Sequence, residues 1–346
     1  MKDSMEAVLI DGGKGEGGGQ ILRTSLTLSC ITGRPLRIEN IRAARRNPGL
    51  AKQHLSCVHA ACQISNGRCR GDSLGSKVLD FQPGPVRSGD YRFDIGSAGS
   101  ASLVIQTVLP ALFLAQEPSR VTVAGGTHNP WAPPFDFLSE TFLPAVATAG
   151  FSAGCKLIKH GFFPAGGGKM TSNVEPRREK QPRAIELPDP GEKPEIRARI
   201  YTARLPAHIA RRQEKLLLKS KLDIEEFEHI EVEDSDGPGN CVMIRICRAG
   251  RTTVLTAFGE RGKPSEKVVG EVVKLAADFL GSGAAVDRFL ADQLLVYMAL
   301  SNGGAYTTSE ISTHLLTNIE VIKEFLPIDF SADERGKQYQ ITSRSL

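Results

Sequence analysis

The chain has 346 residues, of which 40% are hydrophobic and 24% charged, a composition typical of a soluble globular protein large enough for two domains. Its 43 Lys and Arg residues nearly balance its 39 Asp and Glu residues, which excludes a global positive field, so any nucleic-acid site must rest on local basic clusters. No apolar stretch approaches the roughly 18 residues of a membrane span, and Asp3 and Glu6 stand where a signal peptide needs positive charge, so we expect a cytoplasmic protein without a membrane segment.

The number and spacing of the cysteines argue against a disulfide framework and against a zinc site. There are seven of them, an odd number, and they show no paired CxxC spacing. We interpret them as reduced thiols that form neither a disulfide framework nor a zinc site.

The first predicted elements are a strand, Val8–Asp11, a glycine-rich loop over residues 12–19, and a helix closed by Gly33. Backbone N–H groups in such a loop, with the positive end of the helix, favour phosphate oxygens. The loop matches neither common phosphate fingerprint, so a tight strand-to-helix turn explains it about equally well. Glu16 lies among the glycines and Arg23 follows on the helix. Because a carboxylate close to phosphates requires a divalent cation between them, we predict that Glu16 is a metal ligand.

A basic cluster follows the second predicted strand, Leu36–Ile41, on a loop that leads into a predicted helix over residues 53–63. Its residues are Arg42, Arg45, Arg46 and Lys52, followed by Gln53 and His54. The planar guanidinium group of an arginine donates two parallel hydrogen bonds to the oxygens of a phosphate. Charged runs usually mark a solvated surface, but here the Pro48-Gly49 break and the uncharged helix concentrate the charge at one helix N-terminus, which favours anion binding.

The same order of elements returns at residue 91. A strand over residues 91–96, a glycine-serine loop over 96–100 and a helix over 102–115, carrying Gln106, repeat the first arrangement. A strand over 121–127 and a helix that follows Pro133 and ends near Gly150 come next, and we expect residues 161–168 to close the round as a loop and a strand. Each round reads strand-helix-strand-helix-strand-strand over roughly 80–90 residues, which indicates duplicated supersecondary units.

Residues 175–194 are rich in Pro, Arg, Glu and Lys and lack periodicity, so we predict a linker. A separate module follows, with strands over 196–204, 227–232, 241–248 and 253–258 and helices over 207–221 and 265–280. A helix over 284–300 then resumes the third round. The predicted class is α/β (α+β): a large domain of three βαβαββ repeats, residues 1–183 and 281–346, split by an inserted α/β domain, residues 184–280.

His314 lies between a glycine-containing approach at residues 302–304 and an apolar run that ends at Pro327. We expect a turn or strand end that opens into a helix over 320–325, leaving the imidazole free to reach a ligand. A histidine in such a place moves a proton, binds a metal or attacks an electrophile. Taken alone, the pattern is more often that of a buried core histidine.

Several long motifs run in order through nearly the whole chain. They are Asp11–Arg23, Arg42–Arg45, Asn47–Leu50 with Gln53 and His54, Gly96–Ser100, Gly125–Thr127, Pro133–Pro134, Leu290–Gln293 and His314–Asn318. Together they resemble the motifs of the RNA 3′-terminal phosphate cyclases. The resemblance implies a large domain of three βαβαββ units with a smaller α/β domain inserted in its C-terminal part, in agreement with the repeats and the linker predicted above.

The resemblance implies an enzyme that uses ATP and a divalent metal to convert an RNA 3′-phosphate end into a 2′,3′-cyclic phosphate, releasing AMP and pyrophosphate. His314 matches the family's nucleophile, which attacks the α-phosphorus of ATP. The AMP then passes to the RNA 3′-phosphate, and the neighbouring 2′-hydroxyl displaces it. A neutral imidazole is a competent nucleophile near neutral pH, and AMP supplies the leaving group that a phosphate monoester lacks.

Further residues match the family's motifs position by position. Glu16 matches the metal ligand, with Mg²⁺ expected and Mn²⁺ also compatible. The implied phosphate-handling residues, shared by ATP and the RNA end, are Arg23, Arg42, Arg45, Gln53 and His54. The implied adenosine-binding residues are Gln106, Pro133, Phe289, Leu290, Ala291, Asp292 and Gln293. Phe289 stands where the bacterial pattern has Tyr, so stacking on the base is kept and a phenolic hydrogen bond is lost.

Three alternatives explain part of the pattern. A cyclase-like branch of the same fold acts in ribosome assembly without adenylylation, but it departs at the nucleophilic histidine and the adenosine pocket, where this chain has His314, Asp292 and Gln293. A module that only binds RNA ends would explain the basic loop and leave Glu16 without a role. An enolpyruvyl transferase built from similar repeats would need neither His314 nor Glu16. The sequence leaves the processed RNAs and the oligomeric state open.

Two features receive no catalytic role at this point. One is Trp131, the single tryptophan of the chain. The other is a second basic cluster in the predicted linker, made of Arg177, Arg178, Lys180 and Arg183. Such a run could contact an RNA backbone, but we interpret it as a solvated, flexible linker.

Overall fold

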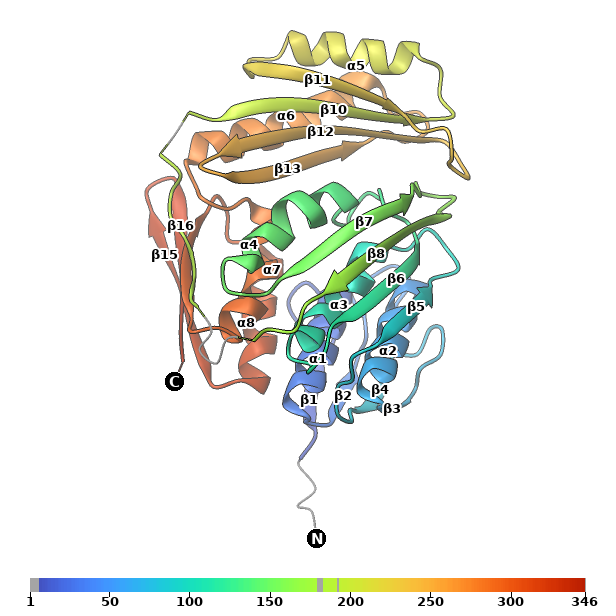
Figure 1. Ribbon diagram of the computed structural model, residues 1–346, viewed down its shortest axis with the longest axis vertical. Helices are drawn as coiled ribbons and strands as arrows, with labels where there is room; N and C mark the ends of the chain where they lie inside the picture. Colours follow the sequence, from blue (N-terminus) through green and yellow to red (C-terminus); the bar gives the residue numbers. More distant parts are fainter. Residues whose placement is uncertain (1–5, 179–182, 192, 346) are drawn as a thin grey trace.

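The computed structural model describes residues 6–178, 183–191 and 193–345, so Lys180 of the second basic cluster lies outside the described residues. Within them the chain forms a mixed α/β structure with four four-stranded sheets (Figure 1). Three sheets and their helices build the larger body, and the fourth sheet lies above it with two helices of its own. Among the described helices, none is long and apolar enough to cross a membrane.

The first two repeats have the same topology, in which a parallel strand pair is extended by an antiparallel pair. The first contains β1 (Val8–Asp11), α1 (Gly19–Thr32), β2 (Leu36–Glu39), α2 (Lys52–Ser65), β3 (Arg68–Arg70) and β4 (Leu79–Gln82), with strand order β1-β2-β4-β3. The second contains β5 (Asp90–Asp94), α3 (Ala101–Phe113), β6 (Ser119–Gly125), a π-helical turn η1 (Phe137–Phe142) continued by α4 (Leu143–Ala147), β7 (Ala153–Lys159) and β8 (Gly168–Val174), with order β5-β6-β8-β7. The predicted βαβαββ order is confirmed for both.

The third repeat is interrupted after its first strand. It consists of β9 (Ile185–Leu187), α7 (Arg288–Ala299), β14 (Gly304–Thr308), α8 (Thr313–Phe325), β15 (Ile328–Arg335) and β16 (Gln338–Ser345), with order β9-β14-β16-β15. The pairing of β9 with β14 is parallel, as in the other repeats. The predicted interruption of the last repeat by a separate module is therefore confirmed.

Three local predictions were wrong. The predicted linker contains β9. Its short apolar alternation was hidden by the prolines around it. We propose that the boundary between the large domain and the inserted domain, placed at residue 184, moves past Leu187. Residues 161–168, predicted as a loop and a strand, form the loop between β7 and β8, and the strand begins only at Gly168. The helix predicted over 284–300 begins at Arg288, because the Asp287 side chain caps it by accepting from the N–H groups of Phe289 and Leu290 at 2.8 and 3.1 Å.

The helices of the three repeats gather inside the larger body. Helix α1 packs against α2, α3 and α8, and α7 packs against α8, while the three sheets lie around them (Figure 1). One continuous apolar core runs through all three repeats. As a result, the N-terminal ends of α1 and α8, from the first and the third repeat, are brought together.

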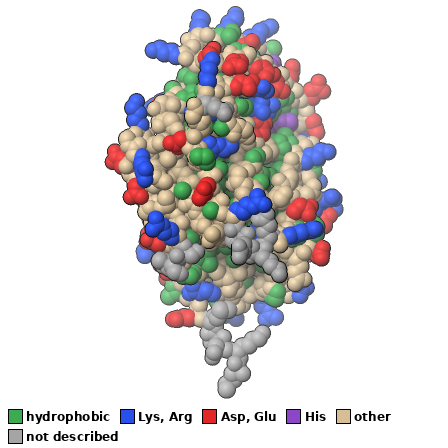
Figure 2. Space-filling model, turned by 60° about the vertical axis from the view of Figure 1, so that its left-hand side comes forward, with side chains coloured by type: hydrophobic (Ala, Val, Ile, Leu, Met, Phe, Trp, Pro, Cys, Tyr) green, Lys and Arg blue, Asp and Glu red, His purple; other side chains and the backbone are tan. Residues whose placement is uncertain are grey.

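The inserted domain consists of β10 (Glu195–Ala203), α5 (His208–Leu218), β11 (Ile224–Glu231), β12 (Gly239–Arg248), β13 (Arg251–Phe258) and α6 (Ser265–Ser282), with strand order β11-β10-β12-β13. Both helices pack on the sheet around a second apolar core. Other residues of the same sheet, among them Tyr201 and Met243, join the core of the larger body. Figure 2 shows acidic side chains gathered near the top of one face, over this domain, with Lys and Arg side chains around them.

A buried polar network joins the inserted sheet to the second repeat. Asp136 accepts hydrogen bonds from His128 Nε2 at 2.9 Å, Tyr201 Oη at 2.8 Å and Arg199 Nη1 at 2.8 Å. Because a carboxylate only accepts, Nε2 of His128 carries a proton, and Nδ1 lies 2.9 Å from the Thr127 hydroxyl. Burial alone would raise the pKa of Asp136, but these donors together hold it below its ordinary value.

We expect Asp136→Asn to lower the free energy of unfolding by about 1–3 kcal/mol, because a neutral amide cannot accept from all three buried donors, although Arg199 keeps its ion pair with Glu228 at 2.6 Å. Denaturant unfolding followed by circular dichroism measures this loss. Asp329→Asn is the matched control, because it removes an exposed ion pair with Lys323 and should leave the transition nearly unchanged. Equal midpoints for the two variants would contradict the assignment.

Candidate active site

His314 lies in the first turn of α8, which begins at Thr313, so the helix predicted over 320–325 starts earlier than expected and includes His314 itself. Ser312 caps this helix, because its hydroxyl accepts from Leu315 N–H at 3.1 Å. The imidazole is about half exposed, with 53% of the side chain accessible. The prediction that the ring is free to reach a ligand is therefore consistent with its position, and the core-histidine interpretation is not.

The glycine-rich loop before α1 packs directly on the first turn of α8. Glu16 N–H donates to Thr317 Oγ1 at 3.0 Å. Gly15 has φ +54°, and a Cβ at this position would lie 2.1 Å from Thr317 Oγ1. Only glycine satisfies both the left-handed backbone and the close approach, so the loop is shaped to bring its residues against His314.

Gln20 joins His314 to Asp292. Its Oε1 lies 3.0 Å from His314 Nδ1, and its Nε2 donates to Asp292 Oδ2. The amide nitrogen donates to the carboxylate and the amide oxygen faces the imidazole, an arrangement that favours the tautomer protonated on Nδ1. Nε2 of His314 then keeps its lone pair, which makes it the nucleophilic atom of the ring.

Asp292 lies behind Gln20, in the interior. Burial raises its pKa to about 7, an effect that the Arg23 guanidinium opposes. Its backbone carbonyl accepts from Asn318 Nδ2 at 2.8 Å, and Asn318 Oδ1 in turn accepts from the Thr24 hydroxyl at 2.7 Å. These bonds fix α1, α7 and α8 relative to one another at the site.

Sequence reasoning assigned no role to Gln20, Thr317 or Asn318. Each lies inside a recognised motif, which was the available signal. Their task is to connect residues about 300 positions apart, for example Glu16 and Thr317, and such pairing becomes visible only when the first and third repeats meet.

The phosphate-handling residues divide into two groups. Arg23 and His54 lie beside Gly19, where a Cβ would come within 2.3 Å of His54 Nε2 and 3.0 Å of Arg23 Nη1, and Arg45 forms an ion pair with Glu16. Burial first, and then neighbouring arginines, lower the pKa of His54 to about 3, so this ring is neutral at physiological pH and adds no charge. The cations at the site are therefore the guanidinium groups.

The second group, Arg42 and Gln53, forms hydrogen bonds with backbone atoms. Arg42 Nη1 donates to the carbonyl of Gly49 at 2.7 Å, and Gln53 Oε1 accepts from Ser100 N–H at 2.6 Å. Gln53 thereby fixes the glycine-serine loop of the second repeat against α2. Arg42 keeps further guanidinium N–H groups, and Gln53 keeps its Nε2 amide, as donors for a phosphate oxygen.

The Glu16 side chain is only 4% exposed and its carboxylate also lies 3.8 Å from His314 Nδ1. Among the described residues no cluster of three His, Cys, Asp or Glu side chains could hold a metal ion alone. A single carboxylate nevertheless suits Mg²⁺, which commonly binds one or two carboxylates and completes its shell with phosphate oxygens and water. The donor set fits an ion shared with a polyphosphate rather than an all-protein cage.

The predicted adenosine-binding residues are brought together only in part. Gln106 Nε2 donates to Gln293 Oε1 at 2.6 Å, and Gln293 Nε2 donates to the carbonyl of Phe289 at 2.6 Å. Phe289 is 42% exposed, with the Arg288 guanidinium 5.5 Å from its ring centroid, whereas the side chains of Leu290 and Ala291 are buried in the core. For those two residues the structure indicates packing under the site rather than contact with a ligand.

Pro133 lies apart from that group along the chain, half-buried just before the helical segment that begins with η1. That segment packs on α7 through the rings of Phe142 and Tyr297, whose centroids are 5.5 Å apart. The two halves of the predicted pocket, Pro133 and Phe289, are thus carried by elements that touch.

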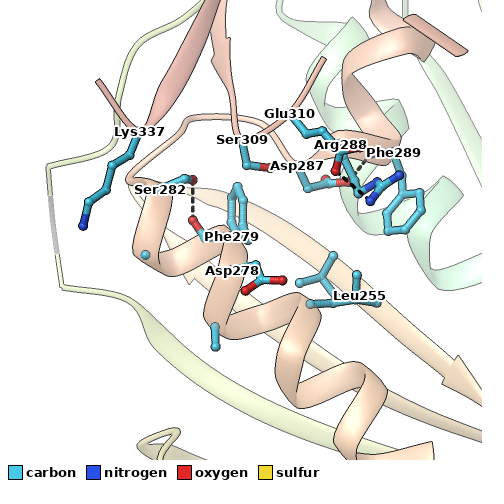
Figure 3. A pocket seen from close by; sticks show the side chains of 13 residues that line it. Leu255, Asp278, Phe279, Ser282, Asp287, Arg288, Phe289, Ser309, Glu310 and Lys337 are labelled. Carbon is cyan, nitrogen blue, oxygen red and sulfur yellow. Dashed lines mark hydrogen bonds and ion pairs between the residues drawn. The ribbon is translucent and has the colours of Figure 1, made fainter. Parts of the chain in front are cut away.

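A cavity of about 480 Å³ opens beside the start of α7 (Figure 3). Phe279 and Leu255 of the inserted domain form its apolar wall, and Arg288 crosses to Glu310 in a 2.7 Å ion pair. Phe289 also lines it. This hollow between the two domains extends the space next to the exposed Phe289 ring.

Several charges act on the titration of His314. Burial is the largest cause that lowers its pKa, and the guanidinium groups of Arg23, Arg45 and Arg288 lower it as well, while the Glu16 carboxylate opposes them. The net shift is downward, so the neutral, nucleophilic form persists below the ordinary titration range of histidine.

We expect Glu16→Gln to lower the pKa of His314 further, because it removes the one negative charge that favours the imidazolium. NMR titration of the imidazole resonances, assigned with a His314→Ala sample, measures the shift. Glu39→Gln, which changes an exposed carboxylate paired with Arg37, is the control and should leave the pKa in place. A rise in the pKa of His314 in Glu16→Gln would refute the charge arrangement.

Comparison with known proteins identifies the family of the chain. A model of the family described as RNA 3′-terminal phosphate cyclase matches residues 14–332. Proteins named RNA 3′-terminal phosphate cyclase are 45% identical in Pseudomonas fluorescens, over 93% of this chain and 94% of that protein, and 46% identical in Koribacter versatilis, over 95% and 93%. The protein of that name in Salmonella enteritidis is 45% identical over 96% of this chain and 98% of its own length. The chain therefore belongs to the RNA 3′-terminal phosphate cyclase family.

Proposed function

We propose that this protein is an ATP-dependent RNA 3′-terminal-phosphate cyclase of the ligase class, which works through a covalent His314–AMP intermediate in the cytoplasm. The observation that carries the proposal is the hydrogen bond from His314 Nδ1 to Gln20 Oε1. It leaves Nε2 as a nucleophile on a half-exposed ring, next to buried and ion-paired arginines that suit a polyphosphate. Family membership supports the same reaction.

In the first step, Nε2 of His314 attacks the α-phosphorus of ATP. An N–P bond forms, the bond to the pyrophosphate oxygen breaks, and pyrophosphate leaves. The ring, still protonated at Nδ1, becomes positively charged, and Gln20 Oε1 and the Glu16 carboxylate face that charge. Arg23 and Arg45 stabilise the negative charge that develops on the departing phosphates.

In the second step, an oxygen of the RNA 3′-phosphate attacks the same phosphorus and the N–P bond breaks, so His314 is released as a neutral imidazole. The product is a phosphoanhydride between the RNA end and AMP. The neighbouring 2′-hydroxyl then attacks the RNA phosphorus, AMP departs with the electrons of the anhydride bond, and the hydroxyl proton passes to water. The 2′,3′-cyclic phosphodiester results.

Binding of the base is assigned to the surface around Phe289. We propose that adenine stacks between Phe289 and Pro133, with Gln106, Asp292 and Gln293 supplying polar contacts. The two glutamine amides already hydrogen-bond each other, which fixes their orientation before a ligand arrives.

A divalent ion fits the proposal through Glu16. The carboxylate would hold Mg²⁺, or Mn²⁺, and the ion would supply neutralisation of triphosphate charge when bound. Arg45, already paired with Glu16, keeps this carboxylate oriented toward the same space.

We expect His314→Ala to lose covalent labelling by α-³²P-ATP completely while retaining ATP binding. The label on the wild type should be acid-labile and alkali-stable, as a phosphoramidate requires. His59→Ala, which removes an exposed histidine paired with Asp72, is the matched control and should label normally. Absence of label on folded, ATP-binding wild type would refute the proposal and favour the RNA-binding, ribosome-assembly alternative.

Gln20→Leu removes both hydrogen bonds of the link between His314 and Asp292 at similar side-chain volume. We expect the rate of His314 adenylylation to fall roughly 10- to 100-fold, as for other residues that orient a reactive imidazole, with little change in ATP affinity. Rapid-quench measurement of label gives the rate, and Gln82→Leu at an exposed position on β4 is the control. An unchanged rate would remove Gln20 from the mechanism.

A further inference from the structure

Trp131 is the single tryptophan of the chain and, among the residues that the structure describes, the most exposed large apolar side chain, with 85% of its surface accessible. Phe163, at 52% exposure, is its neighbour: the ring centroids are 6.3 Å apart and the planes meet at 75°. The rings meet edge to face, and the 85% exposure of Trp131 leaves most of the indole surface accessible. The two residues, called here the aromatic pair, come from different loops of the second repeat.

The conformation of Trp131 is costly. Its φ is +63°, a left-handed value that is a genuine outlier for a bulky side chain. Exposing a large apolar ring adds an unfavourable hydration term, and no core packing offsets it. A strained residue held outward in this way points to a role in binding.

A series of contacts connects the aromatic pair to the candidate active site. Lys52, beside the phosphate-handling residues, donates from Nζ to the carbonyl of Gly96 at 2.9 Å, and Gln53 holds Ser100. On the other side of this 96–100 loop, Asn129 Nδ2 donates to the carbonyl of Ala98 at 2.5 Å. The loop thus lies between the basic cluster and the segment that carries Trp131.

The chain itself gives a second connection. Pro133, assigned above to the adenine site, follows Trp131 by two residues, and two residues span at most about 7 Å. The aromatic pair is therefore next to the proposed adenine contact at Pro133 without being part of the proposed adenine stack, which uses Phe289 and Pro133. A strand entering the site past the 96–100 loop would pass it.

We propose that Trp131 and Phe163 form a stacking platform for a base of the single-stranded RNA that precedes the 3′-phosphate. This rests on the proposed function, whose substrate class it deepens. An open indole face stacks on any base, because every base has a π-face, and it reads no base edges. The platform would thus position an RNA end of any sequence while the guanidinium groups bind its phosphate.

The single tryptophan makes the test direct, because all intrinsic indole fluorescence reports Trp131. Titration with a single-stranded RNA of about ten nucleotides, ending in a 3′-phosphate, should quench this fluorescence. Trp131→Ala should weaken binding of the same RNA, followed by anisotropy of a 5′ dye, roughly 5- to 100-fold. Trp131→Phe, which keeps a ring, should lose less, and Phe163→Leu tests the second member.

A substrate-length comparison separates stacking from a structural effect. The KM of Trp131→Ala should rise for the long RNA and stay unchanged for a nucleoside 3′-phosphate, which has no preceding base. Labelling of His314 by ATP should stay normal. Leu218→Ala, at an exposed apolar position on α5, is the control for loss of surface area and should change neither.

Each contrary result is distinct. Quenching by ATP alone would place adenine on Trp131 and overturn the proposal. A fluorescence change with protein concentration, without RNA, would assign the pair to contact with a second copy. Lack of quenching by RNA in protein that forms labelled His314 would refute the platform and leave the proposed function standing. RNA quenching without any label would support the platform and reject the proposed function.

Discussion

The close contact between the glycine-rich loop and the first turn of α8 is the constraint on which the candidate site depends. Glu16 N–H meets Thr317 Oγ1 at 3.0 Å, and a Cβ on Gly15 would overlap that oxygen. The contact sets α1 of the first repeat against α8 of the third. Gln20 then reaches both His314 and Asp292, so the tautomer of the proposed nucleophile follows from how the two repeats dock.

Charge at the site is arranged around a neutral imidazole. Burial and nearby arginines lower the pKa of both His314 and His54, so the positive charge comes from guanidinium groups, which do not titrate. Glu16 is the carboxylate that stays close to His314. Such a site attracts polyphosphate while its histidine keeps a lone pair, two properties that a protonated histidine could not combine.

The inserted domain is attached by both apolar and polar contacts. Residues of its sheet such as Tyr201 contribute to the core of the larger body, and Asp136 receives donors from both domains. Asp136, the acceptor at the centre of this network, lies in the segment that follows Trp131 and Pro133. The aromatic pair and the proposed adenine contact are thus carried by a segment that the domain junction holds in place.

The sequence by itself determined the repeats, because the period of strands, glycine loops and helices is local and depends on backbone preferences and apolar spacing. It also supplied the motifs that contain His314, Glu16 and the arginines. It did not reveal β9, since three residues among prolines carry too weak a pattern and become a strand only by pairing with β14.

Only the tertiary structure decided how those motifs meet. Gln20 and His314 are 294 positions apart, and their hydrogen bond exists because helix packing brings two N-termini together. Burial likewise separated Phe289, which is exposed, from Leu290 and Ala291, which the same motif had grouped with it but which face the core. The exposure of Phe289, the tautomer of His314 and the shifted pKa values of His314 and Asp292 all depend on the residues packed around these side chains. Those residues come from parts of the chain that no local pattern connects.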